Sequence, residues 1–516
     1  MQHQDEIRKK ILGCWLGKTV GGVLGTPWES DPRTHALTWY DPMPDQALPN
    51  DDLELQVMYL DGLSRMKEPV VNRELLADLW LQHMNFHVQE YGVALCNLRR
   101  GIRPPWSGLL ENHFVDGMGA AIRSELWACL APGEPDRAAI YAREDGCIDH
   151  AGEGIHAEVF FAALESLAFV ESDLDTLIRE ALSRIPEESA VAGFIRQVCR
   201  WWRESGDWLT VRNRLCDACA TEFVSCVLPN VPITVLALLA GGSDFGKTIC
   251  TAVNCGMDTD CTAATAGAVC GIIAPESISD AWLKPIGRTV VIRPECFPGI
   301  TPPDTLDELT DAVLRLRNRL KEGCLPEPAP RPEPQLLEIP AEIAVRHVRE
   351  WWLIPLQGHR WEPLRLPGKY GRIDIERFGE ARQLLLRLRF RVEHDGEYHI
   401  LFNSPTTNHV YLDPDWNRQT PLHDARDMLF GRMRPFLGPE PEGNFPGKAA
   451  LSCQIFNPYI AGAPLNQIKR YQFLKRGEHE LLISFVPCAG DRFIRYGMGI
   501  GSPEESAFLP DAFSCR

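Results

Sequence analysis

The chain has 516 residues, and its 53 Lys and Arg against 70 Asp and Glu give a net charge of −17. This length allows two or three domains, and the acidity argues against nucleic acid or an anionic membrane surface as a partner. The first ten residues lack the apolar core of a signal peptide, and apolar runs such as 231–240 are too short to span a bilayer. Since the seventeen cysteines are scattered through apolar helical patterns, we expect reduced thiols and a cytoplasmic protein.

Residues 1–322 predict an all-α domain. Apolar residues recur at helical spacing, for example over 75–80 and 159–167, and Gly or Pro interrupts the pattern at connection points. Strand-like alternation is scarce in this stretch. Two short clusters of carboxylates near its opposite ends are therefore expected to lie at helix starts.

The first cluster is Asn50-Asp51-Asp52, directly before the helical pattern that begins at Leu55. Adjacent side chains do not share a face inside a helix, but at a helix N-terminus both can reach one ion. The alternative is a helix cap with a favourable dipole partner. For this cluster alone we favour the cap.

The second cluster is Asp258-Thr259-Asp260, which follows Gly256 and precedes a helix of very small residues, 263–268. A tight turn can aim both carboxylates at one point, and hard cations prefer such oxygen clusters. A cap needs only one of these residues, and the turn has two. We therefore expect both clusters to converge on one cleft.

Five motifs in the same order resemble those of the ADP-ribosylglycohydrolases, a family that includes the dinitrogenase-reductase-activating glycohydrolase. The resemblance covers residues 7–320 and implies the all-α fold of that family. The motifs are Gly21–Glu29, Asn50–Asp52, Asp116–Arg123, Asp149-His150 with Gly152–Gly154, and Asp258–Asp260.

The resemblance implies a glycohydrolase with two Mg²⁺ ions (Mn²⁺ as the alternative) that chelate vicinal hydroxyls of a ribosyl unit. The implied substrate is an N- or O-linked ADP-ribosyl adduct, on a protein or as a small-molecule ribosyl glycoside. The implied metal ligands are Asn50, Asp51, Asp52, Asp258, Asp260 and Thr262. The implied catalytic residues are Glu29, Asp51 and Asp260, and the implied substrate-binding residues are Gly117, Met118, Gly119, Asp149 and His150.

Three residues depart from the family pattern. Gly22 replaces the usual Asp, Asn50 replaces a ligating Thr, and Cys261 stands where many members have a further ligating Thr. An amide oxygen can still bind an ion, whereas a thiol suits magnesium poorly, so either Thr262 substitutes or water fills that position. These departures keep a nucleoside or simple glycoside hydrolase open as an alternative function.

A non-catalytic binding or structural protein is the second alternative, as a lens crystallin resembling this family illustrates. The four aspartates argue against it, because a purely structural protein gains little from clustering them. Glu54, beside the first cluster, has no assigned role.

Two further motifs are interpreted as structural. Residues 241–248 fit the phosphate-loop pattern G-x-x-x-x-G-K-[ST], but no buried strand precedes them and a turn follows within about two helical turns. Cys216 and Cys219 form a lone C-x-x-C without a second pair at zinc spacing, so we expect buried thiols.

From residue 323 the composition changes. Prolines alternate with other residues over 326–334, which predicts a semi-rigid linker spanning 323–340. Period-two alternation over 386–392 and 398–402, joined at Asp395-Gly396, predicts a hairpin, and 481–486 predicts another strand. We expect residues 341–516 to form a β-sandwich accessory domain with carbohydrate as a candidate ligand.

We expect limited proteolysis to cut the chain between Leu325 and Pro340, because the alternating prolines hold an extended backbone there. Gel electrophoresis and mass spectrometry of the fragments would locate the cut. A chain ending at Cys324 should still unfold cooperatively, and loss of that transition would contradict the predicted boundary.

Overall fold

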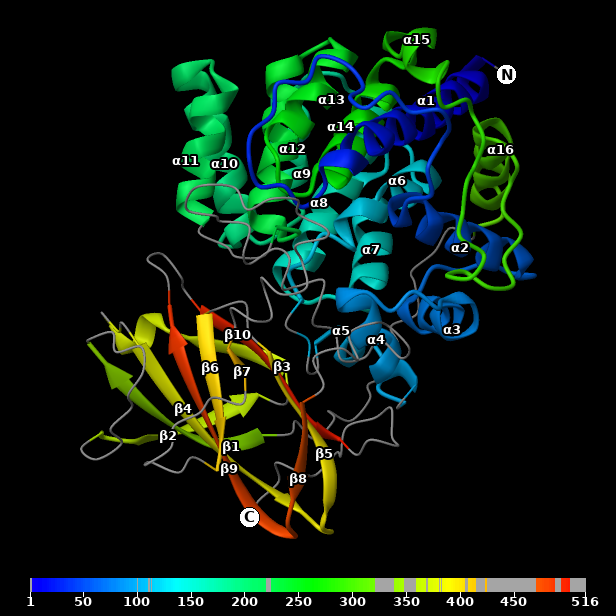
Figure 1. Cartoon of the computed structure of the whole chain (residues 1–516). Coiled ribbons are helices and arrows are strands. Elements are labelled where there is room, and N and C mark those ends of the chain that lie inside the picture. The colour runs from blue at the N-terminus through cyan, green and yellow to red at the C-terminus, as the bar shows by residue number, and fades with distance from the viewer. Residues whose placement is uncertain are drawn as a thin grey trace. The chain divides into compact units, whose positions relative to one another are not determined.

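The computed structural model of the chain describes residues 2–99, 101–109, 112, 114–219, 224–320, 338–347, 359–367, 370–379, 381, 383–403, 407–413, 423–424, 470–487 and 493–501. These residues fall into two compact units, a helical unit up to residue 320 and a unit of strands from residue 338 (Figure 1). Most of the predicted linker lies outside the described residues, although the first strand begins within its predicted range. The exact domain boundaries stay a prediction.

The helical unit confirms the predicted all-α fold. Its described residues form sixteen α-helices and three short 3₁₀ helices, and they contain no β-strand. The α-helices are α1 (Gln2–Gly25), α2 (Asp51–Arg65), α3 (Arg73–His83), α4 (Gln89–Arg99), α5 (Trp106–Leu109), α6 (Glu125–Leu130), α7 (Pro135–Gly146), α8 (Glu153–Ala168), α9 (Leu174–Leu182), α10 (Ala190–Ser205), α11 (Trp208–Cys219), α12 (Val227–Gly241), α13 (Phe245–Asn254), α14 (Thr259–Ile273), α15 (Asp280–Leu283) and α16 (Leu306–Arg317). The 3₁₀ helices are η1 (Thr26–Trp28), η2 (Ala121–Arg123) and η3 (Pro275–Ser277).

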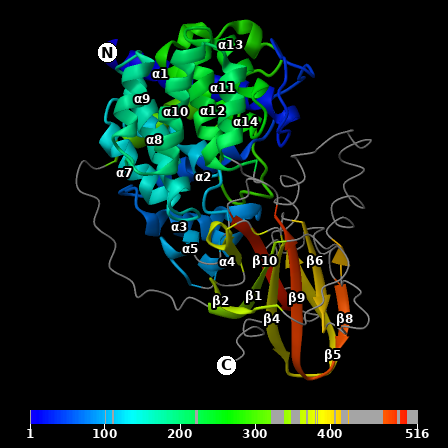
Figure 2. The same ribbon diagram turned by 90° about the vertical axis from the view of Figure 1, so that its left-hand side faces the viewer.

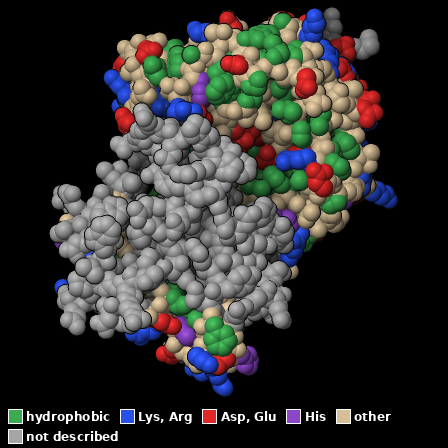
Figure 3. Space-filling view, viewed as in Figure 1, with side chains coloured by type: hydrophobic (Ala, Val, Ile, Leu, Met, Phe, Trp, Pro, Cys, Tyr) green, Lys and Arg blue, Asp and Glu red, His purple; other side chains and the backbone are tan. Residues whose placement is uncertain are grey.

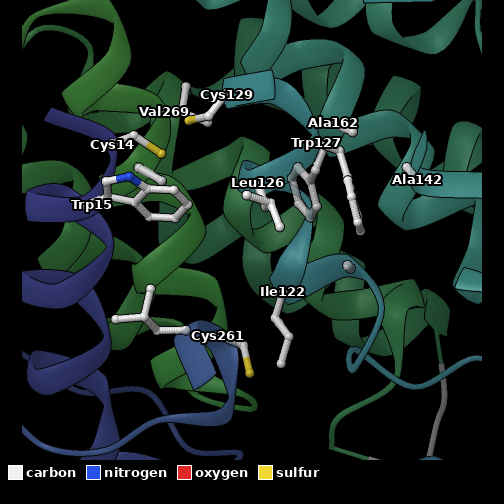
Figure 4. Packing of buried hydrophobic residues seen from close by; sticks show 14 of the residues in the cluster. Cys14, Trp15, Ile122, Leu126, Trp127, Cys129, Ala142, Ala162, Cys261 and Val269 are labelled. Atoms are coloured by element: carbon white, nitrogen blue, oxygen red, sulfur yellow. The ribbon is translucent and has the colours of Figure 1, made fainter. Parts of the chain in front are cut away.

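Helix α14 lies at the centre of this unit. Every residue from Thr259 to Ile272 is buried, which is the pattern of a helix enclosed on all sides. Figure 4 shows Val269 of α14 near Cys14 of α1 and Cys129 of α6, within one hydrophobic core. None of the helices in the described part of the chain combines the length and apolarity that a membrane crossing needs.

Helices α1 and α14 touch backbone to backbone along a stripe of glycines. A Cβ built on Gly17 would lie 2.0 Å from the carbonyl oxygen of Gly267, and one built on Gly13 would lie 2.1 Å from that of Gly271. The reverse is also true, because a Cβ on Gly267 or Gly271 would lie 2.3 or 2.0 Å from the carbonyl oxygen of its partner. Only glycine fits at these positions, so the small-residue helix predicted from the sequence serves this close approach.

The second unit consists of antiparallel strands in two sheets. One sheet has the order β2-β1-β4-β9-β6-β7 and the other β3-β10-β5-β8, and Figure 2 shows β4, β9 and β6 side by side. Buried residues from both sheets lie in a single hydrophobic cluster. The strands are β1 (Glu338–Arg346), β2 (Glu362–Pro367), β3 (Tyr370–Asp374), β4 (Gln383–Val392), β5 (Gly396–Asn403), β6 (Thr407–Leu412), β7 (His423–Asp424), β8 (Arg470–Leu474), β9 (Gly477–Val486) and β10 (Phe493–Gly501), with the 3₁₀ helix η4 (Glu376–Phe378).

The predicted hairpin of residues 386–402 is wrong. Strand β4 pairs with β1 and β9, whereas β5 pairs with β10 and β8 in the other sheet. The turn at Asp395 therefore carries the chain between sheets, and the turn at Lys475-Arg476 does the same between β8 and β9. The carboxylate of Asp395 joins the two turns, accepting from the Arg476 amide at 2.7 Å and from Lys475 Nζ at 2.9 Å. Alternation predicts a strand but not its partner, which explains the error.

The phosphate-loop pattern and the C-x-x-C pair both lie in helical surroundings. Residues 242–244 form a turn between α12 and α13, and Asp244 caps α13 by accepting from the Lys247 amide at 2.9 Å. Cys216 and Cys219 are free thiols on α11, the first half-buried and the second buried.

We expect Gly17→Ala to destabilise the helical unit by about 1–3 kcal/mol or more, because the new methyl group would meet the Gly267 carbonyl and neither backbone can yield alone. Urea unfolding followed by the helical circular dichroism signal would measure it. Gly193→Ala in α10 is the matched control, since a Cβ there meets nothing within 4 Å. That control should stabilise the chain by roughly 0.5–1 kcal/mol, and equal destabilisation in both variants would contradict the close contact.

Candidate active site

The amide of Asn50, rather than either neighbouring carboxylate, caps α2. Its Oδ1 accepts from the backbone N–H of Asp52 at 2.9 Å, as an N-cap residue should. The interpretation of this cluster as a helix cap is therefore correct for Asn50 but not for Asp51 or Asp52. The carboxylates of Asp51 and Asp52 make no cap and contact other segments instead.

Asp258 occupies the N-cap position of α14 but makes no side-chain cap. It follows a turn in which Gly256 and Met257 both have a left-handed backbone, with φ of +70° and +75°. This turn is fixed from outside, since a Cβ on Gly256 would lie 2.2 Å from the Arg33 carbonyl oxygen. In this turn the Asp258 carboxylate does not bind the backbone of its own helix. The interpretation of Asp258 as a helix cap is therefore wrong.

The two carboxylate clusters converge, although more than 200 residues separate them in sequence. Asn50 Nδ2 donates to Asp260 Oδ2 at 3.2 Å, and the Cys261 thiol donates to Asp52 Oδ1 at 3.6 Å. One ligand atom from each of Asp52, Asp260 and Cys261 lies within 4.8 Å of the others, a spacing that a metal ion could span. On the face of the helical unit shown in Figure 3, acidic side chains lie recessed among other atoms.

Contact between α1 and α14 sets this convergence. A Cβ on Gly25 would lie 2.4 Å from the Cα of Asp260, and the Thr259 hydroxyl donates to the Gly25 carbonyl at 2.9 Å. Gly22, where the family pattern has an acid, faces Asn50, and its Cβ would lie 3.2 Å from Asn50 Nδ2.

The converging carboxylates are buried and incompletely paired. Asp52, Asp258 and Asp260 are only 1%, 3% and 6% exposed, and each has one carboxylate oxygen without a hydrogen bond. Burial is the largest influence raising the pKa of all three, and like charges add to it. Such a cluster fits a divalent cation, because positive charge would compensate the buried negative charge and occupy the open oxygens.

The buried side chain of Lys18 offsets part of the negative charge of these carboxylates. Lys18 Nζ donates to Glu125 Oε1 and to the Ile122 carbonyl at 2.8 Å each, and lies 3.7 Å from Asp52 Oδ2. Although burial lowers the pKa of Lys18, Glu125 and Asp52 raise it to a value above the ordinary one. Gln56 also binds Glu125 and the Asp52 carbonyl. The sequence analysis missed this network, and only the presence of a lysine in an apolar helical stretch signals it.

Glu29 directly follows η1 and is exposed as a residue, although its carboxyl lies near the aspartates and is partly screened from solvent. The like charge of Asp260 is the largest influence raising the pKa of Glu29 well above its usual range. Partial burial of the carboxyl and the like charges of Asp51 and Asp52 raise it further. The next residues bind the turn before Asp258, since the Ser30 amide donates to the Met257 carbonyl at 3.0 Å. Glu29 therefore belongs to the carboxylate group and is the member open to solvent.

The predicted substrate loop Gly117-Met118-Gly119 is buried and held by α4. Gly119 N–H donates to Glu90 Oε1 at 3.1 Å, and a Cβ on Gly117 or Gly119 would lie 2.8 or 2.4 Å from that oxygen. The Tyr91 hydroxyl lies 3.3 Å from both the Gly119 carbonyl and Asp51 Oδ2. The loop is thus linked to Asp51 through Tyr91, neither Glu90 nor Tyr91 having been predicted.

Asp149 and His150 are fully buried beneath this loop. Arg123 Nη2 donates to Asp149 Oδ1 at 2.6 Å, and Arg123 Nη1 donates to the Gly119 carbonyl at 2.7 Å. His150 lies 2.9 Å from Asp149 Oδ1 and 3.4 Å from Glu90 Oε1. These side chains fix the loop from below, and their direct contact with substrate stays a prediction.

Glu54, which the sequence left without a role, is fully buried and binds Arg293 with both carboxylate oxygens. The Arg293 guanidinium lies 4.5 Å from the ring centroid of Phe86 and lowers the pKa of Glu29 in opposition to the aspartates. Glu54 is therefore structural, and its substitution would disturb the site's rim.

Thr262 is fully buried, and its hydroxyl donates to the Thr259 carbonyl at 3.3 Å, within its own helix. The predicted ligand position is thus turned toward the helix backbone, while the neighbouring Cys261 thiol faces Asp52. Of the two residues, it is Cys261 whose side chain lies within metal-ligand spacing of Asp52 and Asp260.

Comparison with known proteins supports the resemblance drawn from the motifs. The family model described as ADP-ribosylglycohydrolase matches residues 3–322, more than half of the chain. A solved structure described as an ADP-ribosylglycohydrolase-related protein complex is similar to it at 20% identity and a TM-score of 0.43, covering 61% of this chain and 99% of that chain. At that TM-score the likeness adds no weight to the family model. A search of curated proteins gave no match.

We expect the free energy of unfolding to decrease as the pH rises from about 6.5 through about 9, with His150 as one cause. Burial lowers the pKa of His150, but Asp149 and Glu90 raise it from 6.5 to about 9. Protonation of His150 therefore adds roughly 3 kcal/mol to the free energy of unfolding at a pH below the unfolded pKa. This contribution is lost as the pH rises through the folded pKa.

Urea unfolding of the wild type and of His150→Gln between pH 6 and 10 would test this expectation. The difference in stability between the two should shrink as the pH rises. His156→Gln, in the next helix, is the control and should keep the wild-type slope. A wild-type advantage over His150→Gln that stays constant with pH would refute the charge assignment.

Proposed function

Because the chain belongs to the ADP-ribosylglycohydrolase family, we propose that it hydrolyses an N- or O-linked ADP-ribosyl bond, or a related ribosyl glycosidic bond. The single observation that supports this most is the convergence of Asp52 and Asp260, which like the neighbouring Asp258 each have a buried carboxylate oxygen without a hydrogen bond. The proposed substrates are ADP-ribosylated proteins and small-molecule ribosyl glycosides.

We propose that the site binds two divalent cations, Mg²⁺ or Mn²⁺. Asn50, Asp51 and Asp52 would hold them from α2, and Asp258 and Asp260 from α14, with Thr262 or Cys261 beside them. Bound cations would supply positive charge near the anomeric carbon and a chelating site for vicinal ribose hydroxyls. Lys18 keeps Asp52 in place from the opposite side.

Glu29 is the proposed proton-transfer group. Glu29 is exposed as a residue, and the charge of Asp260 raises the pKa of its carboxyl well above the usual range, which favours the protonated form. Such a carboxyl can give that proton to the leaving group or take one from the attacking water. Arg293 opposes the aspartates in setting this pKa, so it tunes the same step from the rim.

The loop Gly117-Met118-Gly119 is proposed to orient the sugar or its phosphates. Arg123 and Glu90 hold the loop backbone at the Gly119 carbonyl and amide, and Tyr91 joins it to Asp51. A fixed loop lowers the entropic cost of placing the scissile bond beside Glu29. Asp149 and His150 contribute by positioning Arg123 and Glu90. For the strand unit, carbohydrate is the proposed ligand.

Asp260→Asn should lower turnover by about 100-fold or more, since loss of a ligand exceeds the roughly 10–100-fold effect of changing a residue behind one. The assay would follow release of ADP-ribose from modified protein and of ribose from nucleosides, with Mg²⁺, with Mn²⁺ and with chelator. The matched control is Asp280→Asn, an exposed aspartate on α15, which should keep wild-type activity.

Full activity in chelator, or equal activity in the two variants, would overturn the metal-dependent mechanism. Release of ribose from nucleosides alone would assign the chain to the nucleoside hydrolase alternative. Inactivity on all these substrates would favour a different glycoside or a non-catalytic binding protein.

A further inference from the structure

We propose that Cys261 is itself a metal ligand and gives the position shared with Asp52 and Asp260 a preference for a borderline or soft divalent cation, such as Zn²⁺ or Co²⁺, over Mg²⁺. The inference rests on the proposed function for placing an ion between these carboxylates. It goes further by assigning a ligand and an ion class that oxygen-only ligation would not select.

The thiol is placed where a ligand would have to be. Its sulfur lies 3.6 Å from Asp52 Oδ1, and it belongs with Asp52 and Asp260 to a group whose ligand atoms are all within 4.8 Å. Two atoms that each lie about 2.0–2.3 Å from one ion are at most about 4.6 Å apart. The observed sulfur–oxygen distance is compatible with a shared ion.

Unsatisfied oxygens at the same place supply an independent reason to expect an ion. Asp52 Oδ2, Asp258 Oδ1 and Asp260 Oδ1 accept no hydrogen bond, and their side chains are at least nine-tenths buried. The Cys261 sulfur lies with Asp52 of the first cluster and Asp260 of the second in one group of ligand atoms. The sulfur therefore stands between carboxylates of both clusters.

The neighbouring alternative, Thr262, faces its own helix. The Thr262 hydroxyl donates to the Thr259 carbonyl in its own helix, whereas the Cys261 thiol donates across to α2. Among the described residues, this is the group of acidic, histidine or cysteine ligands that satisfies the spacing of a metal site. The structure thus favours sulfur over the threonine hydroxyl at this position.

The ion class follows from the ligand chemistry. Thiolate is a soft ligand that selects zinc and other late divalent metals, while magnesium requires oxygen donors. Binding replaces the S–H bond by a sulfur–metal bond and releases the thiol proton to solvent. The remaining oxygens of Asp51 and Asp258 would still suit Mg²⁺ or Mn²⁺, which gives a pair of unlike ions.

Cobalt titration of the reduced, metal-stripped full chain would test the assignment without relying on activity. Wild type should develop a near-ultraviolet sulfur-to-cobalt charge-transfer band that Zn²⁺ removes at far lower concentration than Mg²⁺. Cys261→Ser should lose the band. Cys261→Thr, which restores the family's usual residue, should weaken Co²⁺ and Zn²⁺ binding by at least about tenfold and leave Mg²⁺ binding little changed. Cys199→Ser, a buried thiol on α10, is the control and should keep the band.

The outcomes separate this inference from the proposed function. Absence of the band in wild type, its persistence in Cys261→Ser, or tighter Mg²⁺ than Zn²⁺ binding in wild type would overturn the inference even if ribosyl hydrolysis is observed. A band that depends on Cys261 would support the inference even if no ribosyl substrate is cleaved. If Cys261→Ser is unstable, Cys261→Thr supplies the same comparison, and absence of the band in wild type is decisive without any variant.

Discussion

The candidate site depends on the direct contact of two helix backbones, those of α1 and α14. Glycines at each crossing point let the chains approach until a methyl group would not fit, and the stripe ends where Gly25 meets Asp260. This contact places η1 and Glu29 beside the aspartates of α14. It also brings Gly22 opposite Asn50, so one packing arrangement sets the position of both carboxylate clusters.

Around the cluster, the protein places its cations behind or beside the carboxylates instead of among them. Lys18 binds Asp52 from the α1 side, Arg123 holds Asp149 beneath the glycine loop, and Arg293 is held at the rim by Glu54. Each of these cations is fixed by another acid. Lys18 therefore offsets part of the charge of Asp52, while Asp258 Oδ1 and Asp260 Oδ1 keep no hydrogen-bond partner and could bind a metal ion.

The sequence was sufficient to predict the helical fold and the strands that follow, because periodicity is a local signal. It also predicted that Asp52 and Asp260 lie close together, because the ordered motifs that contain them are local signals too. It did not resolve what Asn50 and Asp258 each do, since capping depends on backbone geometry that Gly256 and Met257 impose from outside the motif. It missed Lys18, Glu90 and Tyr91 because nothing local distinguishes them from ordinary helical residues. Their roles arise from contacts between distant segments, as does the crossing between sheets at Asp395.

The pairing of α1 with α14 also has a consequence for synthesis of the chain. Helix α1 ends at Gly25 and its partner begins at Thr259, so the first helix leaves the ribosome long before the surface that covers it exists. At about 5–20 residues per second this delay is roughly 10–50 s. Throughout that time the glycine stripe of α1 lacks the backbone that covers it, and Asp260 cannot join Asp52. The site is therefore among the last parts of the helical unit to assemble, although contacts of α1 such as that of Lys18 with Glu125 can form earlier.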